Sequence, residues 1–168
     1  RIRLYLFILS LASLALIPIF RANASNADLY LSPASGTYAL GNVFNIEVDV
    51  SSLEEAMNSV SGEINFSTDI VNVDSVIKNE SIFDLWGAQD LTFSNSTGKI
   101  TFTAVKFNPG FLGIKGRIFT VVFRATNLGT ANISFASGRV LANDGNGTAM
   151  AVTMRSGQYK IIPSTIIP

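Results

Sequence analysis

The sequence contains no cysteine and no histidine. Their absence excludes disulfide bonds, cysteine nucleophiles, Ser-His-Asp triads and zinc sites built from the usual ligands. Charged residues make up only 14% of the 168 residues, and the formal net charge is zero. A nucleic-acid-binding protein needs a basic surface to neutralise phosphates, so we expect no nucleic-acid partner.

Hydrophobic residues are abundant by contrast, at 48%, and part of the excess lies at the N-terminus. The positive segment Arg1–Arg3 precedes an apolar run from Leu4 to Phe20, and Ala22-Asn23-Ala24 follows. This order is typical of a secretory signal-peptide helix with cleavage after Ala24. The alternative is a retained membrane anchor, at the short end of what spans a bilayer. We therefore expect a secreted protein, with cell-surface attachment through this segment or through a C-terminal anchor beyond the sequence.

From Ser25 onward, short β-type segments alternate with turns. Gly116–Ala125 (GRIFTVVFRA) is the longest of these segments and is rich in β-branched and aromatic residues, which favour strands. Val43–Val50 alternates between apolar residues and the polar residues Asn45, Glu47 and Asp49, which predicts a strand with one solvated face. The other expected strands are Asp28–Ser32, Val60–Phe66, Ile70–Ile77, Leu91–Asn95, Lys99–Phe107, Ala131–Val140 and Met150–Ile161.

The segments between these strands are interpreted as turns and loops. Ser51–Asn58 contains the only good helix formers after the signal peptide, and we expect a crossing loop with at most one helical turn. Ala34–Gly41 and Asn108–Gly116 are rich in glycine and are predicted to be turn and loop segments. Many strands at regular spacing with almost no helix predict a β-sandwich. Residues 25–161 then form one domain, and 162–168 begin a linker.

Five segments, taken in this order, resemble a bacterial cohesin domain, and the resemblance covers about Asp28 to Thr153. They are Ala27–Gly36 (ADLYLSPASG), Val60–Val71 (VSGEINFSTDIV), Asn108-Pro109-Gly110, Gly116–Ala125 and Val140–Thr148 (VLANDGNGT).

The resemblance implies a nine-stranded jelly-roll, immunoglobulin-like sandwich related to family 2 and 3 carbohydrate-binding modules. It also implies a non-catalytic module that binds dockerin modules, which fold with calcium and are often carried by polysaccharide-degrading enzymes. A module that holds polysaccharide directly is the alternative.

Cohesins grip a dockerin helix with a polar strand face and adjoining loops, which directs attention to two segments here. The outward residues of Val60–Phe66 and of the hairpin after it would form a flat polar face, with apolar anchors beside it. The solvated side of any sandwich would look the same. The predicted partner-binding residues are Ser61, Glu63, Asn65, Leu85, Trp86, Asn95, Thr97, Thr101 and Thr103.

Trp86 is the single tryptophan, and two interpretations of it remain open. An exposed indole could stack on a sugar ring or anchor a partner. However, modules that bind crystalline polymers present several coplanar aromatic residues, and most phenylalanines here occupy inward strand positions. A tryptophan at the edge of the core is the favoured interpretation.

Asp144 and Asn146, in the sequence Asn143–Thr148 (NDGNGT), are weak candidates for a calcium loop because calcium prefers clustered oxygen ligands. Position 155, where an EF-hand loop would carry glutamate, is arginine, and these residues also form tight turns without metal. We expect no cofactor. The carboxylate pairs Asp84/Asp90 and Glu54/Glu55 suggest no glycosidase cleft, so we expect no enzymatic activity.

Overall fold

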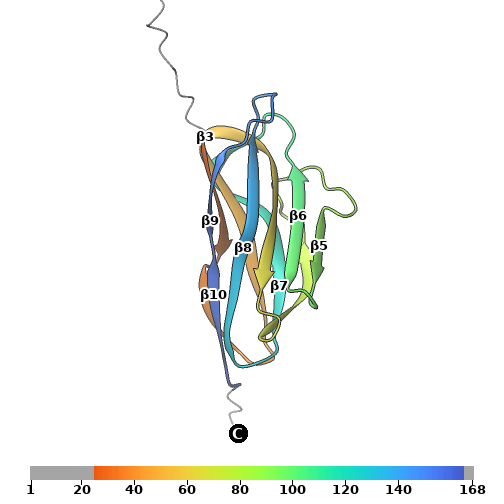
Figure 1. The fold of residues 1–168 in the computed structure, drawn as a ribbon, viewed down its shortest axis with the longest axis vertical. Coiled ribbons are helices and arrows are strands. Elements are labelled where there is room, and N and C mark those ends of the chain that lie inside the picture. Colours follow the sequence, from red (N-terminus) through yellow and green to blue (C-terminus); the bar gives the residue numbers. More distant parts are fainter. Residues whose placement is uncertain (1–24, 165–168) are drawn as a thin grey trace, which may run out of the picture.

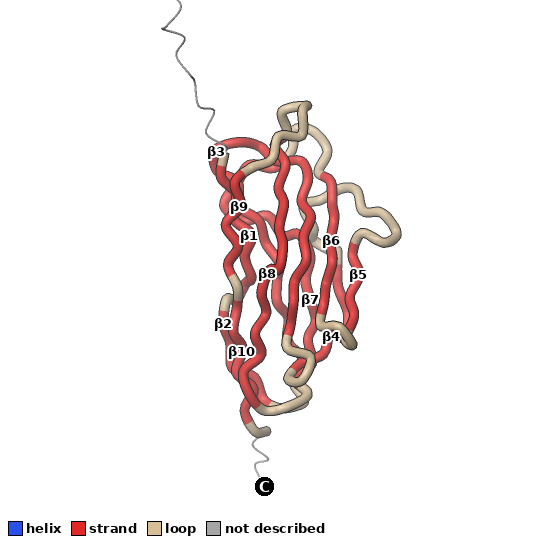
Figure 2. The backbone as a smooth tube through the Cα atoms, in the orientation of Figure 1, coloured by secondary structure: helices blue, strands red, loops and turns tan. Residues whose placement is uncertain are grey.

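The computed structural model describes residues 25–164, which form an all-β sandwich without helices (Figures 1 and 2). This confirms the predicted fold class. The described part of the chain contains no helix of the length and apolarity that a membrane span requires. The predicted signal peptide or anchor lies outside the described residues, as does the end of the predicted linker.

The described residues form ten strands, which are numbered in chain order. They are β1 (Asn26–Ser32), β2 (Ser35–Ala39), β3 (Val43–Phe66), β4 (Val71–Ile77), β5 (Leu91–Ser94), β6 (Lys99–Val105), β7 (Phe111–Ala125), β8 (Gly129–Ala142), β9 (Ala151–Arg155) and β10 (Gly157–Ile162).

The long strand β3 joins the two layers of the sandwich. Its first half pairs with β1 and β7, and its second half pairs with β6 and β8. We call the first layer, in the order β9-β1-β3-β7-β4, layer A, and the second, in the order β5-β6-β3-β8-β10-β2, layer B. Both layers therefore share one strand, which curves from one to the other (Figure 1).

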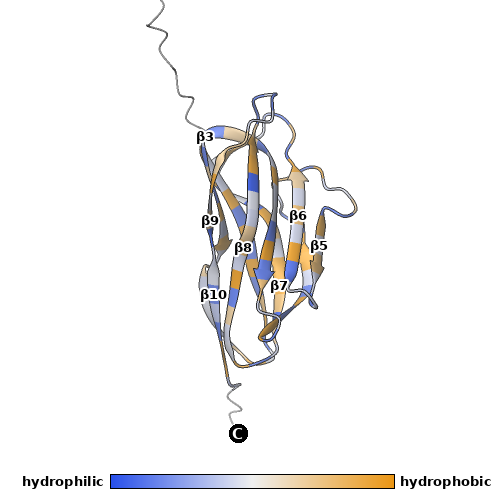
Figure 3. Ribbon diagram, viewed as in Figure 1, coloured by the Kyte–Doolittle hydropathy of each residue, from blue (hydrophilic) through white to orange (hydrophobic). Residues whose placement is uncertain are grey.

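The core lies between the layers and is built from apolar residues that alternate with polar ones along the strands. Figure 3 shows this alternation as changes of colour along the ribbons. Phe44, Ile46, Val48 and Val50 are all buried, as the alternation in β3 predicted. Phe119 of β7 has no exposed surface, and its ring centroid lies 5.3 Å from that of Phe102 in β6. Burial of one such aromatic side chain contributes about 2 kcal/mol to stability, so contacts of this kind hold the layers together.

Ser51–Asn58 does not form the expected loop or helical turn but continues β3 as an irregular strand. Pairing to β7 shifts register between Val50 and Ser52 and again between Ser52 and Met57, where the strand passes between layers. The Ser52 hydroxyl donates to the carbonyl of Glu55 inside this bend. Pairing of both flanks thus overrides the local helix propensity.

Three other predicted boundaries were wrong. Ser35–Ala39 forms β2 because it pairs in parallel with β10. Met150–Ile161 splits into β9, which pairs with β1, and β10, which pairs with β8, so the sandwich has ten strands among the described residues instead of about nine. β7 begins at Phe111 inside the predicted loop, because Phe111 pairs with Met57 of β3 and Gly113 pairs with Ser52.

Candidate functional site: the polar face of layer B

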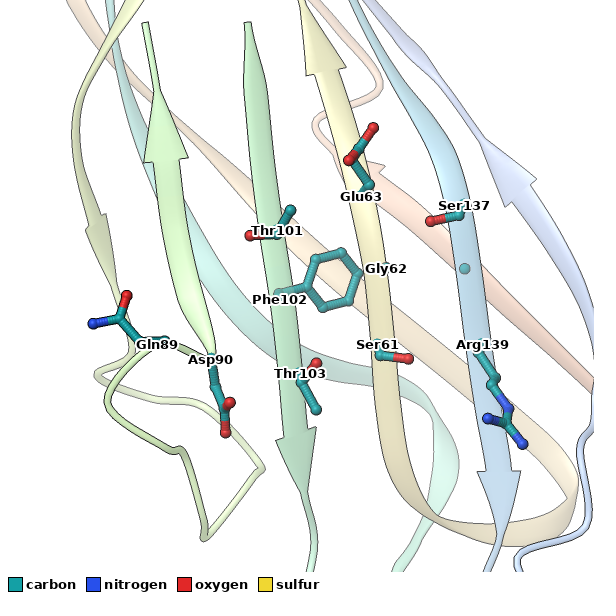
Figure 4. Close-up of a pocket in the computed structure, with 11 residues that line it drawn as sticks. Ser61, Gly62, Glu63, Gln89, Asp90, Thr101, Phe102, Thr103, Ser137 and Arg139 are labelled. Carbon is teal, nitrogen blue, oxygen red and sulfur yellow. The ribbon is translucent and has the colours of Figure 1, made fainter. Parts of the chain in front are cut away.

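The register of β5, β6, β3 and β8 aligns their outward side chains in three rows across layer B. Figure 4 shows the parts of two rows that lie on β6, β3 and β8, Thr101–Glu63–Ser137 and Thr103–Ser61–Arg139. Because side chains alternate between the faces of a strand, residues two apart along each strand share the outer face. The rows are Thr92–Thr101–Glu63–Ser137, Thr103–Ser61–Arg139 and Ser94–Lys99–Asn65–Ser134.

The centre of this face is a shallow depression of about 370 Å³. Gly62 and Gly138 pair directly beneath it and carry no side chains. A Cβ at Gly62 would lie 2.7 Å from Phe102 Cζ and 2.6 Å from the carbonyl oxygen of Ser137. The Phe102 ring, which is 2% exposed, therefore packs directly beneath the strand at Gly62. The missing side chains at Gly62 and Gly138 thus leave room for the core beneath the strands, and hydroxyl-bearing side chains form the surface above.

Four of the predicted partner-binding residues line this depression together: Ser61, Glu63, Thr101 and Thr103. Asn65 lies in the adjacent row and is exposed. Their grouping depends on the antiparallel register of β3 and β6, which places Ser61 opposite Thr103 and Glu63 opposite Thr101.

Asn95 and Thr97 lie in the turn between β5 and β6 rather than over the depression. The Asn95 side chain accepts a hydrogen bond from the amide of Val73 at 2.8 Å and donates one to the carbonyl of Val73 at 2.9 Å. Asn95 thus ties β4 to the hairpin of layer B. Thr97 is exposed, and its amide donates to the Ser94 hydroxyl.

Leu85 and Trp86 lie in the segment before β5, and they differ in their exposure to solvent. Leu85 is 51% exposed and pairs through its backbone with Val105 at the end of β6. Trp86 is half-buried and packs edge-on against Phe83 and Phe119, at centroid distances of 6.3 and 6.5 Å. The structure therefore confirms Trp86 as a residue at the edge of the core, and its ring is not free to serve as a flat sugar-stacking surface.

Sequence reasoning missed Gln89, Asp90, Ser137 and Arg139, which complete the lining of the depression. The paired residues of β3 and β8 are between 67 (Phe66 and Ile133) and 85 (Met57 and Ala142) positions apart in the sequence, and no local pattern indicates that pairing. The alternation along β8 could have suggested an outward Arg139, although not which strand it would lie beside.

The charges on this face are few, and two of them form an ion pair. Lys99 Nζ lies 2.7 Å from Glu63 Oε1. Asp90 accepts a hydrogen bond from the amide of Gly87. Arg139 forms no hydrogen bond or ion pair with the residues that the structure describes. The depression therefore offers hydroxyl groups and one uncommitted positive charge to a ligand.

The weak calcium candidates, Asp144 and Asn146, lie in a turn that Asp144 holds together. Asp144 Oδ1 accepts hydrogen bonds from the amides of Asn146 at 2.9 Å and Gly147 at 3.0 Å, and the Thr148 hydroxyl donates to Oδ2. These bonds lower the pKa of Asp144 to about 2. Asp144 thus organises a tight turn, and no three acidic side chains within residues 25–164 gather in a metal-binding arrangement.

The carboxylates considered for catalysis serve structural bonds. Asp84 accepts hydrogen bonds from Lys106 Nζ at 3.0 Å and from the amide of Phe107 at 2.8 Å, which lower its pKa. Glu54 accepts from the amide of Asn26 at 3.1 Å, and the hydroxyl of Ser25 donates to Glu55 at 2.6 Å. These carboxylates fix loops and the start of β1.

No protein-family model matches the sequence, and no curated protein matches it. Solved structures do match. A type I cohesin from Clostridium thermocellum, solved in a cohesin–dockerin complex, superposes with a TM-score of 0.67 at 14% identity and covers 82% of this chain and 99% of that one. The seventh ScaB type I cohesin from Pseudobacteroides cellulosolvens gives 0.67 at 11% identity, covering 84% and 96%.

A non-cellulosomal cohesin from the hyperthermophilic archaeon Archaeoglobus fulgidus gives a TM-score of 0.62 at 16% identity, covering 82% of this chain and 92% of that one. The described chain has the cohesin fold. The likeness spans nearly the whole of each cohesin domain, and it extends from cohesins solved with dockerins to one outside cellulosomes.

Proposed function

We propose that the protein is a non-catalytic, dockerin-binding module that acts outside the cell. The observation that carries the proposal is the polar depression on the β5-β6-β3-β8 face of a cohesin-fold sandwich. Neighbours with this fold have been solved as complexes with dockerins. Ser61, Glu63, Thr101 and Thr103 would contact the partner, with Asn65 and the exposed Leu85 at the margin of the contact.

The dimensions of the face suit a helix. Neighbouring strands lie about 4.8 Å apart, so β6, β3 and β8 together span about 10 Å, which is about the diameter of an α-helix. Hydroxyl groups can donate and accept, so Ser61, Thr101 and Thr103 could bond to polar side chains of a helix laid across them. Leu85 would supply apolar burial beside this polar centre.

Direct binding of polysaccharide receives less support. Trp86 packs against Phe83 and Phe119, and Tyr159 is fully buried with its hydroxyl bonded to the Pro33 carbonyl at 2.7 Å. Tyr38 stacks on Phe44 at 3.9 Å. These rings are therefore held by packing and do not form a row of coplanar aromatic surfaces.

The test measures binding to the dockerins encoded in the same genome, with calcium present, by isothermal titration calorimetry. We expect one or more to bind in the micromolar range or tighter. Thr101→Arg should weaken binding by about 100-fold, because the new side chain fills the depression. Asn45→Arg, an exposed substitution on the layer A half of the same strand, is the matched control and should leave binding unchanged.

Two outcomes would contradict the proposal: no dockerin binds, or the two variants weaken binding equally. Affinity electrophoresis on insoluble polysaccharides forms the second arm. Retardation on a polysaccharide without dockerin binding would favour the carbohydrate-binding alternative.

A further inference from the structure

Ion pairs account for most lysine and arginine side chains in residues 25–164. Lys106, Lys115, Arg117, Arg124 and Arg155 each lie within an ion pair, as does Lys99. Lys78 instead lies over the Trp86 ring, 5.2 Å from its centroid. Arg139 and Lys160 have neither kind of partner among the described residues, and only Arg139 lines the depression.

Nothing near Arg139 on its own face is available to neutralise it. Its row neighbour Ser61 is uncharged. Glu63, in the next row, is held by Lys99 at 2.7 Å. Asp90 bonds to the amide of Gly87 and lies at the far side of the face, beyond Thr103, whose amide donates to the Asp90 carbonyl at 2.7 Å. The depression therefore carries an unpaired positive charge at its β8 side, with the carboxylate of Asp90 at the opposite side.

We propose, resting on the proposed function, that Arg139 is the residue by which this face selects its partner. It would pair with an aspartate or glutamate on the dockerin helix, and the helix would carry small or hydroxyl-bearing residues beside that carboxylate, over Ser61 and Thr103. The partner chemistry is thus an acidic position within an otherwise polar, uncharged helix face.

The physical reason is the cost of covering a guanidinium. Arginine carries five N–H donors and keeps its charge at all relevant pH values, so a partner that covers it without supplying acceptors leaves those donors unsatisfied. A carboxylate can accept two parallel bonds from the guanidinium and compensate the loss of water. A partner with lysine or arginine at the same position would place two cations together and be rejected.

The experiment uses a dockerin that the unaltered protein binds and measures Kd at several sodium chloride concentrations. Arg139→Gln should weaken binding about 10-fold, and Arg139→Glu by more, with a shallower dependence of Kd on salt. Arg155→Gln removes a paired arginine from layer A and should leave both quantities unchanged. Replacing the acidic residue of the dockerin helix with lysine should restore binding to Arg139→Glu.

The outcomes separate this inference from the proposed function. If Arg139→Glu binds within twofold of the unaltered protein while Thr101→Arg abolishes binding, the role of Arg139 is wrong and the binding face stands. If neither Arg139→Glu nor Thr101→Arg changes binding, both the role of Arg139 and the proposed binding face are wrong. Thermal unfolding of each variant, which we expect to be unchanged for these exposed positions, shows that the fold is intact.

Discussion

The outer faces of the two layers carry opposite kinds of polar surface. On layer A, Lys115 pairs with Glu47 at 2.7 Å, Arg124 with Asp74 at 2.6 Å and Arg155 with Asp28 at 3.0 Å, while Arg117 bridges Glu47 and Glu80. On layer B, serine and threonine hydroxyls surround the depression, with a single ion pair between Lys99 and Glu63 and the unpaired Arg139.

The charged side chains of layer A already have partners within the protein, whereas the polar side chains of layer B are available to a binding partner. A ligand on layer A would have to replace existing ion pairs or bury them, and burying charge is costly. A ligand on layer B meets hydroxyls that exchange water for new bonds at small cost. Layer B is thus the face on which binding energy can be gained.

Asp49 shows how far the layer A network extends into the protein. Its carboxylate has no exposed surface and accepts no hydrogen bond, although Lys115 Nζ lies 3.5 Å from Oδ2. Burial raises the pKa of Asp49, and Lys115 opposes that rise. The sequence pattern had placed Asp49 on the solvated side of β3. The charged network on layer A therefore reaches into the interior, whereas the hydroxyls around the depression of layer B lie at the surface.

The largest expected effect comes from adding a side chain beneath the layer B depression, where the packing leaves no space for one. Gly62→Val would bring a side chain against Phe102 and the Ser137 carbonyl, so we expect the free energy of unfolding to fall by about 3 kcal/mol and partner binding to weaken with it. Ala136→Val, at an exposed position of β8, should change stability by less than about 0.5 kcal/mol. Urea denaturation measures both, and equal effects would show that the close packing at Gly62 is unimportant.

Breaking the layer A network should have a smaller effect, confined to stability. Lys115→Met leaves the buried Asp49 charge without its nearest cation, and we expect a loss of about 1.5 kcal/mol because Lys115 is itself half-exposed. Adding Asp49→Asn should recover part of the loss, and dockerin affinity should stay unchanged in both variants. Non-additivity is measured by a double-mutant cycle in urea. Strictly additive effects would mean that the two residues are not coupled.

The pH dependence of the free energy of unfolding should show the effect of the raised pKa of Asp49. Because its folded pKa is raised, its contribution is fully present below the unfolded pKa and is lost as the pH rises through the folded value. The free energy of unfolding of the protein minus that of Asp49→Asn should therefore fall from about pH 4 towards neutrality. Urea titrations at several pH values measure this difference. A difference that rises with pH would mean that Asp49 is stabilised as a carboxylate.

The smallest effect is expected for the equivalent substitution on layer B. Lys99→Met removes an ion pair whose lysine side chain is 49% exposed, so stability should change by no more than about 0.5 kcal/mol. Comparison with Lys115→Met tests the contrast between the layers with one type of substitution. A loss for Lys99→Met as large as that for Lys115→Met would remove the contrast.

The alternation of polar and apolar residues predicted the site residues whose position depends only on segments close together in the sequence. Alternation placed Ser61 and Glu63 outward, and the short hairpin of β5 and β6 brought Thr101 and Thr103 to the same face. Arg139 could not be placed, because its position beside Ser61 depends on pairing between distant strands. Residues 51–58 were expected to form a loop or one helical turn. They continue β3 instead, because pairing on both sides outweighs the helix propensity of these residues.

Backbone amide chemical shifts, recorded by NMR as a bound dockerin is titrated into the isotope-labelled protein, test the central claim most directly. We predict that the largest changes fall at Ser61, Glu63, Thr101, Thr103 and Arg139, while the amides of Tyr30, Glu47 and Arg124 on layer A stay in place. Changes concentrated on layer A, with the β5-β6-β3-β8 face undisturbed, would contradict the account.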